Sequence, residues 1–547
     1  MADILAREHI VAAPGFNRWL VPPAALAIHL SIGMAYGFSV FWLPLSRAIG
    51  ITKPIACPDD MDFLAKLFAT TCDWKISWLG WMYTLFFVFL GLSAAAWGRW
   101  LERVGPRKAG AVAAVCWGGG LLISAIGIYT HQIWLMWLGS GVIGGIGLGL
   151  GYISPVSTLI KWFPDRRGMA TGMAIMGFGG GAMIGAPLAD RLMKYYATAS
   201  SVGVWETFAT LGVIYFVAMM LGAFGYRIPN ADWKPAGWVP KTRVGNGMIT
   251  TRNVDVTEAY KTPQFWLLWA ALTLNVSAGI GVIGMASPML QEVFGGHLMG
   301  VDLSLSALLP DQRAKVATIG AAFAGLLSLF NIAGRFFWAS LSDYIGRKIT
   351  YVIFFALGIA LYASAPSAGA IGNIAVFVGI FCLILTMYGG GFATIPAYLA
   401  DMFGTRFVGA IHGQILTAWS TAGILGPVMV NYIREYQIGH GVPASQAYNV
   451  TMYLLAGLLF IGLICNLLVR PVAAKHFMTE AQLEAEATMK ASDREKMIAA
   501  ADAVQANQTT PVASTSLAIV FVAWLLVGIP LAWGVWNTVV KAAAFLH

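Results

Sequence analysis

Apolar segments long enough to cross a lipid bilayer recur thirteen times along the chain, and each crossing needs about 20 such residues. Charged residues make up 11% of the sequence, against about 25% in a typical soluble domain. We therefore predict an all-α polytopic membrane protein. The segments lie near 19–46, 76–98, 109–129, 133–160, 168–193, 205–226, 264–291, 314–341, 349–366, 372–400, 408–433, 447–469 and 516–541.

Lys and Arg concentrate in the connections that would face the cytoplasm if the N-terminus were inside. The tight connections on the other side, 130–132 and 367–371, contain neither residue. By the positive-inside rule we expect a cytoplasmic N-terminus in a bacterial inner (plasma) membrane. Arg7 and Arg18 precede the first span without a short apolar region and cleavage site, so we expect no cleavable signal peptide.

The longest polar connection divides the first twelve segments into two sets of six. We predict an N-terminal six-helix half at 1–226 and a C-terminal six-helix half at 263–470, joined by a cytoplasmic loop at 227–262. A charged segment at 471–515 is expected to be a cytoplasmic helix and linker. An additional transmembrane helix at 516–547 follows; it brings the C-terminus outside if it spans, which Lys541 weakly opposes.

The two halves carry similar landmarks in the same order. Gly151, Pro155 and Pro187 in the first half match Phe392, Pro396 and Pro427 in the second, and the proline pairs lie 32 and 31 residues apart. Two halves of one orientation place a substrate site at their interface near the middle of the membrane.

The turns after the second and eighth segments resemble the signature of the major facilitator superfamily, G-x-x-x-D-R-x-G-R-[RK]. The first reads Gly98-Arg-Trp-Leu-Glu-Arg-Val-Gly-Pro-Arg-Lys and the second Ala339-Ser-Leu-Ser-Asp-Tyr-Ile-Gly-Arg-Lys, with Glu, Ala and Tyr departing from the pattern. The resemblance implies a major facilitator fold of two six-helix halves, to which the apolar segment at the C-terminus adds one extra helix. It also implies that acids and bases of these turns gate one face: Glu102, Arg103, Arg107, Asp343 and Arg347.

Two further runs resemble the oxalate/formate antiporter family, which is related to monocarboxylate transporters. They are Lys161-Trp-Phe-Pro-Asp-Arg-Arg-Gly168 and the stretch from Gly389 to Gly423, which contains Phe392-Ala-Thr-Ile-Pro and Leu416-Thr-Ala-Trp. The resemblance covers Trp19 to Arg470. The last segment lies outside it and is similar to a small single-span protein that accompanies such transporters.

Arg335 lies about eight residues inside the eighth segment, which places it roughly 12 Å from the helix end. A cation there costs at least ~2.5 kcal/mol, so we expect it to bind substrate. The planar guanidinium group of Arg335 can bind a carboxylate through two hydrogen bonds. The resemblance implies the same substrate-binding role. The alternative is pairing with a buried acid, but no Asp or Glu occupies the central part of a segment.

Two departures from the related families bear on specificity. Asn331 stands one turn before Arg335, where monocarboxylate carriers place an Asp; Asn331 can hydrogen-bond a substrate or satisfy a neighbouring helix. Trp419 stands where oxalate exchangers place a Lys. A dianion facing one cation would keep an uncompensated charge, so we favour a monocarboxylate of the formate, lactate or pyruvate type over oxalate.

Four aromatic residues lie on segments that line the cavity in the resembled superfamily: Tyr36, Tyr152, Tyr388 and Phe392. Their hydroxyls can bond a carboxylate and their rings can shape a dry pocket, although each could equally be packing. They are candidate substrate-binding residues together with Arg335, Asn331 and Trp419.

Cys57 and Cys72 share one predicted outer loop, where either a disulfide or two free thiols are consistent with the sequence. No phosphate-binding loop, metal cluster or nucleophile–base pair is evident, so we expect neither an enzyme nor a cofactor. The expected partners are a small carboxylate anion, with protons or a counter-anion, and the lipid bilayer; we expect a monomer without nucleic acid. The functional hypotheses are monocarboxylate transport, oxalate/formate antiport, and a transporter-like sensor.

Overall fold

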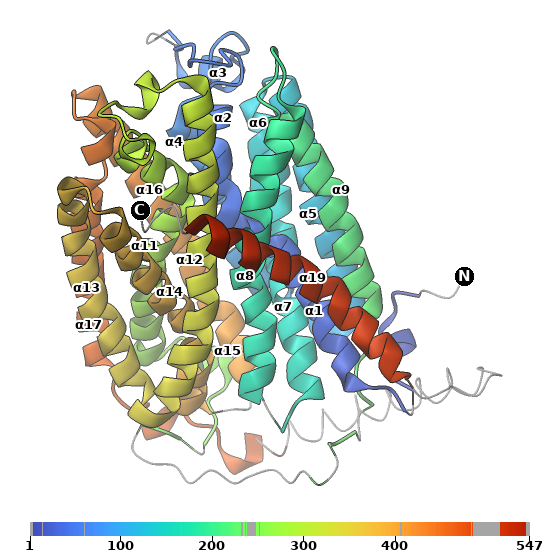
Figure 1. Ribbon diagram of the computed structural model, residues 1–547. Coiled ribbons are helices and arrows are strands. Elements are labelled where there is room, and N and C mark those ends of the chain that lie inside the picture. The colour runs from blue at the N-terminus through green and yellow to red at the C-terminus, as the bar shows by residue number, and fades with distance from the viewer. Residues whose placement is uncertain are drawn as a thin grey trace.

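The computed structural model describes residues 4–13, 15–58, 61–165, 167–230, 233–235, 237, 248–250, 252–404, 407–482, 484 and 515–542. Within these residues, long helices run side by side in a bundle (Figure 1). Twelve described helices are long and apolar enough to cross a membrane. The predicted all-helical fold is confirmed. Most of the predicted helix and linker at 471–515 lies outside the described residues.

The first half contains six crossings of the bundle. The first crossing is α1 (Val21–Ile32), η3 (Gly33–Phe41) and α2 (Trp42–Leu45) in succession. The others are α4 (Ile76–Val104), α5 (Pro106–Tyr129), α6 (Ile133–Met136) with η4 (Trp137–Gly144) and α7 (Gly145–Trp162), α8 (Arg167–Tyr196) and α9 (Val204–Gly225). Three short helices flank them: η1 (Arg7–Ile10), η2 (Arg18–Leu20) and α3 (Phe63–Leu67).

The second half repeats this arrangement. Its crossings are α11 (Pro263–Phe294), α12 (Pro310–Ile345), α13 (Arg347–Ile371), α14 (Ile374–Phe403), α15 (Val408–Ile415) with α16 (Thr417–Gly439), and α17 (Asn449–Leu468). Its short elements are α10 (Val256–Ala259), η5 (His297–Met299), η6 (Leu305–Ala307), η7 (Ala444–Gln446) and η8 (Ala474–His476).

The predicted segment at 408–433 differs most from expectation. It is broken at Leu416 into α15 and α16. The helix α16 is not among the twelve apolar helices, because Asn431, Arg434 and Glu435 occupy its second half. It nevertheless packs inside the bundle, between α4 of the first half and α11 of the second.

The halves meet along two seams, where α4 packs against α16 and α8 packs against α12. Three irregular stretches lie on crossings of the bundle: the 3₁₀ stretch η3, the π-helical stretch η4 and the break at Leu416. Such irregularities mark strain or functional hinges.

The last helix, α19 (Leu517–Ala542), crosses the outside of the bundle obliquely (Figure 1). It packs against α8 and α12, one from each half. Its length and composition suffice for a membrane crossing, as predicted for this segment.

Candidate functional site

Arg335 lies inside the bundle on α12 and is only 2% exposed. Its Nε donates a hydrogen bond to Asn331 Oδ1 at 3.1 Å. Gly179 of α8 faces it so closely that a Cβ there would lie 3.0 Å from Nε. A glycine at this position therefore makes room for the guanidinium at the seam between the halves.

An aromatic wall covers Arg335 on the second-half side. The guanidinium carbon lies 5.7 Å from the centre of the Phe392 ring, within cation–π range. Phe392 packs on Trp419 with ring centres 4.3 Å apart, and Trp419 meets Tyr152 of the first half at 5.3 Å. Trp419 thus bridges the two halves beside Arg335, three residues after the break in the eleventh crossing.

A second inter-half contact closes the site. The hydroxyls of Tyr36 and Tyr388 form a hydrogen bond of 2.8 Å, which joins η3 to α14. All seven predicted substrate-binding residues are buried, and contacts link them into one cluster.

Several hydrogen-bond donors in this cluster have no protein partner among the described residues. They are Arg335 Nη1 and Nη2, Asn331 Nδ2, the Tyr152 hydroxyl and Trp419 Nε1. A buried donor without a partner is costly, about 1–3 kcal/mol and more when it is charged. Convergence of such donors around a buried guanidinium is the chemistry expected for an anion site.

The site is closed in this structure. The central cavity measures about 10 Å³, the size of roughly one water molecule. Tyr36, Ser328 and Asn331 contribute to its walls. A substrate would have to enter by movement of the halves.

Within the described residues, no carboxylate pairs with Arg335. Buried Glu292 accepts hydrogen bonds from Arg434 and from the Tyr448 hydroxyl, the latter at 2.6 Å. Among the described residues, no group of His, Cys, Asp and Glu is arranged to hold a metal ion.

The sequence did not single out Tyr83, Phe87 and Phe178, which complete the cluster. Phe178 packs on Tyr36 and Trp419 at 4.9 and 5.4 Å, and Phe87 on Trp419 at 5.7 Å. The hydroxyl of buried Tyr83 has no partner among the described residues. Apolar rings on apolar helices give no pattern that would separate them from ordinary packing.

Three of the five predicted gating residues, Arg107, Asp343 and Arg347, make contacts within their own half. Arg347 binds Asp343, and its Nε lies 3.6 Å from Asp401 Oδ2, which ties α12 and α13 to α14. Arg107 Nη1 donates to the Ile4 carbonyl at 3.0 Å, and Nη2 to two carbonyls at the end of α9. Arg103 is exposed, and the side chain of Glu102 lies outside the described part of the chain.

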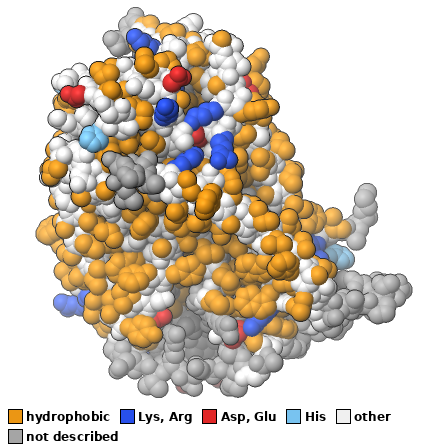
Figure 2. Space-filling view, in the orientation of Figure 1, with side chains coloured by type: hydrophobic (Ala, Val, Ile, Leu, Met, Phe, Trp, Pro, Cys, Tyr) orange, Lys and Arg blue, Asp and Glu red, His pale blue; other side chains and the backbone are white. Residues whose placement is uncertain are grey.

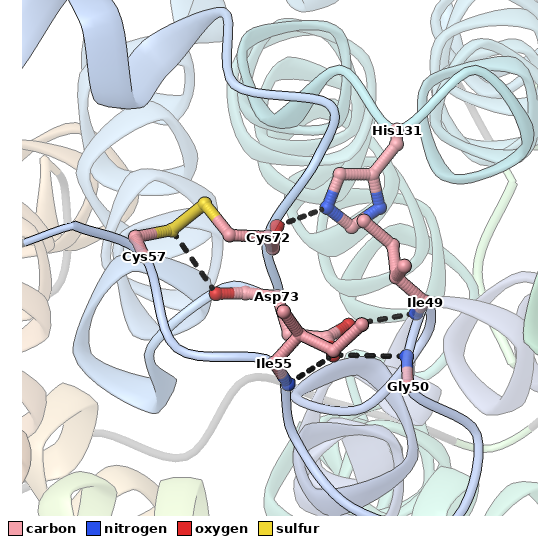
Figure 3. The surroundings of a disulfide bond; sticks show 7 residues. All are labelled: Ile49, Gly50, Ile55, Cys57, Cys72, Asp73 and His131. Atoms are coloured by element: carbon pink, nitrogen blue, oxygen red, sulfur yellow. Dashed lines mark hydrogen bonds between the residues drawn. A yellow bond between two sulfur atoms is a disulfide. The ribbon is translucent and has the colours of Figure 1, made fainter.

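A disulfide joins Cys57 and Cys72 in the loop between the first two crossings (Figure 3). We call this end of the bundle the disulfide end. Beside it, Asp73 accepts hydrogen bonds from the backbone N–H groups of Ile49, Gly50 and Ile55 at 2.7, 3.0 and 2.8 Å. His131 Nε2 contacts the Cys72 carbonyl at 2.8 Å. These contacts order a long connection.

Comparison with known proteins supports this architecture. The family model of the Major Facilitator Superfamily matches residues 15–427. The chain is 28% identical over 349 residues to the oxalate:formate antiporter of Oxalobacter formigenes, covering 63% of this chain and 73% of that protein. It is 27% identical over 364 residues to apicoplast pyruvate carrier 1 of Toxoplasma gondii, covering 58% and 63%.

The fold also matches a solved transporter. The inward-facing structure of a bacterial homologue of the human lysosomal transporter Spinster superposes with a TM-score of 0.55 at 14% identity, covering 85% of this chain and all of that one. The family match ends before α19, so the similarity of that helix to an accessory protein stays a prediction. The chain belongs to the major facilitator superfamily and is a multi-pass membrane transporter, not an enzyme.

Proposed function

We propose that this transporter moves small carboxylate anions by alternating access, with Arg335 as the central anion-binding residue. The observation that carries the proposal is the buried guanidinium, whose Nη1 and Nη2 have no partner among the described residues. Two parallel N–H groups match the two oxygens of a carboxylate. The relatives are named as carriers of oxalate, formate and pyruvate, which are all carboxylates.

We infer a preference for monocarboxylates from the charge of the cluster. Arg335 is surrounded by aromatic rings and by Asn331, and Trp419 adds an indole N–H but no charge. One guanidinium balances one carboxylate, while a second carboxylate would remain uncompensated in a site of low dielectric. Oxalate/formate exchange is the second candidate, favoured by the similarity to the Oxalobacter antiporter.

The proposed cycle follows from burial and charge. An anion bound at Arg335 neutralises the guanidinium, and the loaded halves then rock about the central site. Opening of the site at either end has to break the Tyr36–Tyr388 hydrogen bond or slide the two helices of one seam past each other. The irregular stretches η3 and η4 and the break at Leu416 provide points where the crossings can bend. An empty site keeps a bare buried cation, which disfavours reorientation and so favours exchange or coupled transport.

We further propose that the disulfide end faces the periplasm and the N-terminus lies in the cytoplasm. A disulfide persists in an oxidising compartment, and the Lys/Arg distribution supports the same orientation. Coupling to protons or to a counter-anion is part of the proposal. The transport assay below distinguishes the two.

The test is uptake in reconstituted vesicles with labelled formate, lactate, pyruvate and oxalate, with and without a pH gradient or internal anion. We expect wild type to accumulate monocarboxylates and Arg335→Gln to lose nearly all uptake. Stimulation by a pH gradient indicates proton coupling, and stimulation by internal anion indicates exchange. Equal uptake by Arg335→Gln contradicts the site assignment. Binding without accumulation in wild type supports a sensor, and strong block by oxalate alone supports the second candidate.

A further inference from the structure

A cavity of about 1310 Å³ opens at the disulfide end, above the closed central site. Both halves form its walls: the loop after α2 and the end of α8 from the first, and the end of α11 and the start of α12 from the second. Figure 2 shows Lys and Arg side chains gathered on the upper part of the face that α8, α12 and α19 share. Lys194 borders the cavity.

Two arginines from opposite halves face this cavity. Arg47 follows α2 in the first half, and Arg313 lies in the first turn of α12 in the second. Burial lowers the pKa of Arg47, and the charge of Arg313 lowers this pKa further. Both side chains line the same cavity, so two like charges share it.

Neither arginine has its hydrogen-bonding capacity filled. The Nε atoms of Arg47 and Arg313 are buried without a partner among the described residues. Arg313 Nη1 donates to the Thr52 carbonyl at 3.0 Å, a contact between the halves. This bond fixes Arg313 beside the loop that carries Arg47, but adds no negative charge.

Two of the three acids of the cavity wall, Asp190 and Glu292, have other partners. Asp190 binds Lys194 at 3.0 Å and accepts a hydrogen bond from Thr318 at 3.2 Å. Glu292 is bound by Arg434 and Tyr448. Asp302 is exposed at the rim. The charges of Arg47 and Arg313 therefore have no carboxylate partner among the described residues.

We propose that Arg47 and Arg313 form a second anion site, which captures a small carboxylate at the disulfide end before it reaches Arg335. This inference rests on the proposed carboxylate transport. An anion between two guanidinium groups relieves their repulsion and gains charge-assisted hydrogen bonds from both. Because one arginine comes from each half, the bound anion also draws the halves together at this end. Capture and closing of the entrance are then the same event.

The experiment compares transport in the two directions, in vesicles sorted for one orientation, with lactate and oxalate as probes. Arg47→Gln and Arg313→Gln are expected to raise KM for entry from the disulfide end about tenfold, equivalent to ~1.4 kcal/mol. KM from the opposite end should remain within about twofold, since Arg335 is intact. The matched control is Lys53→Gln, which removes an exposed charge from the same loop outside the cavity wall.

The charge-retaining variants Arg47→Lys and Arg313→Lys separate binding from folding. We expect each to recover most of the entry KM, and wild-type KM to rise with ionic strength more steeply than that of the Gln variants. Unchanged entry KM in both Gln variants overturns the site, and so does equal loss in the Gln and Lys variants. Absence of carboxylate transport by wild type instead overturns the proposed function, so the two failures are distinguishable.

Discussion

Asn331 Oδ1 accepts a hydrogen bond from Arg335 Nε at 3.1 Å, one helical turn away on α12. This bond holds the guanidinium by one edge and leaves its Nη atoms for another partner. An Asn at this position orients the cation without neutralising it. The chemistry of the pair therefore depends on residue 331 staying uncharged.

In the Asn331→Asp variant, the carboxylate at residue 331 should compete with the substrate for Arg335. At neutral pH the new carboxylate pairs with Arg335, so KM for a monocarboxylate should rise about tenfold, or ~1.4 kcal/mol. Pairing with the guanidinium keeps the new carboxyl ionised, so lowering the pH to 5 should not restore uptake by the variant. Initial uptake rates between pH 8 and 5 measure this. A KM in Asn331→Asp equal to that of wild type would falsify the pairing.

Trp419→Lys should change which anion is preferred. Trp419 lies against Phe392 and Tyr152 in the same cluster as Arg335, so a Lys there would add a second cation close to the first. We expect Ki for oxalate to fall by about tenfold or more and Ki for lactate to change little. Competition against labelled formate gives both values. The control Trp419→Phe keeps the ring and should keep the monocarboxylate preference; equal behaviour of Lys and Phe variants contradicts the charge argument.

The Tyr36–Tyr388 hydrogen bond predicts coupling between the halves. Because the bond joins η3 to α14, removing either hydroxyl breaks the same inter-half contact. Tyr36→Phe and Tyr388→Phe should each change turnover several-fold, and the double variant should be no worse than the stronger single one. A coupling energy of about 0.5–1.5 kcal/mol is expected from such a cycle. Strictly additive effects would show that the hydroxyls act independently.

The central residue of the site could be predicted because a buried charge is costly. The position of Arg335 in an apolar helix indicates a functional role for that reason. The family resemblance adds Trp419, Asn331 and Tyr152 as candidate residues of the same site. The repeat likewise indicated two similar halves. These features are encoded by residue type and spacing, which a single sequence displays.

Other features depend on packing that spacing does not display. The break at Leu416 divides a segment that reads as one continuous apolar run, and η3 and η4 lie in equally apolar stretches. Arg47 and Arg313 lie 266 residues apart in connections that read as ordinary polar loops. Only folding of the two halves brings such residues to one cavity.

The burial of His131 predicts that the stability of the loop at the disulfide end depends on pH. Burial lowers the pKa of this histidine below its ordinary 6.5, although the Cys72 carbonyl and Asp73 act in the opposite direction. The ring is therefore neutral when the loop is ordered, while an opened loop binds the proton more readily. Loop stability is complete above pH 6.5 and declines as pH falls from there toward the lowered pKa.

Hydrogen exchange at the Ile49, Gly50 and Ile55 amides measures this decline, because these groups donate to Asp73 next to the disulfide. Protection corrected for intrinsic exchange should be lower at pH 5.5 than at 7.5 in wild type. His131→Asn removes the titrating ring and tolerates the positive φ of 53° at this residue. The variant should lose most of the pH dependence; an unchanged dependence would assign it to another group.

The contacts of α19 with both halves predict that this helix restrains the movement of one half against the other. Asn537 accepts a hydrogen bond from Arg191 of α8 at 2.7 Å. On its other side, a Cβ at Gly325 of α12 would lie 2.8 Å from Thr538 Oγ1. Neighbouring residues of one helix thus contact opposite halves. Rocking that slides α8 past α12 must release one of these contacts.

A disulfide between Gly325→Cys and Thr538→Cys should fix α19 to α12 while Arg191 still holds it to α8. In a background with Cys116, Cys382 and Cys465 replaced by Ala, oxidation should reduce uptake by more than half and reduction should restore it. The matched control joins α19 to α8 through Ile184→Cys and Gly534→Cys, because a Cβ at Gly534 would lie 2.9 Å from Ile184 Cγ1. Because this link adds no second attachment across the seam, its effect should be small. Equal inhibition by both links would mean that α19 must leave the bundle during transport, and full activity of both would show that it moves freely with either half.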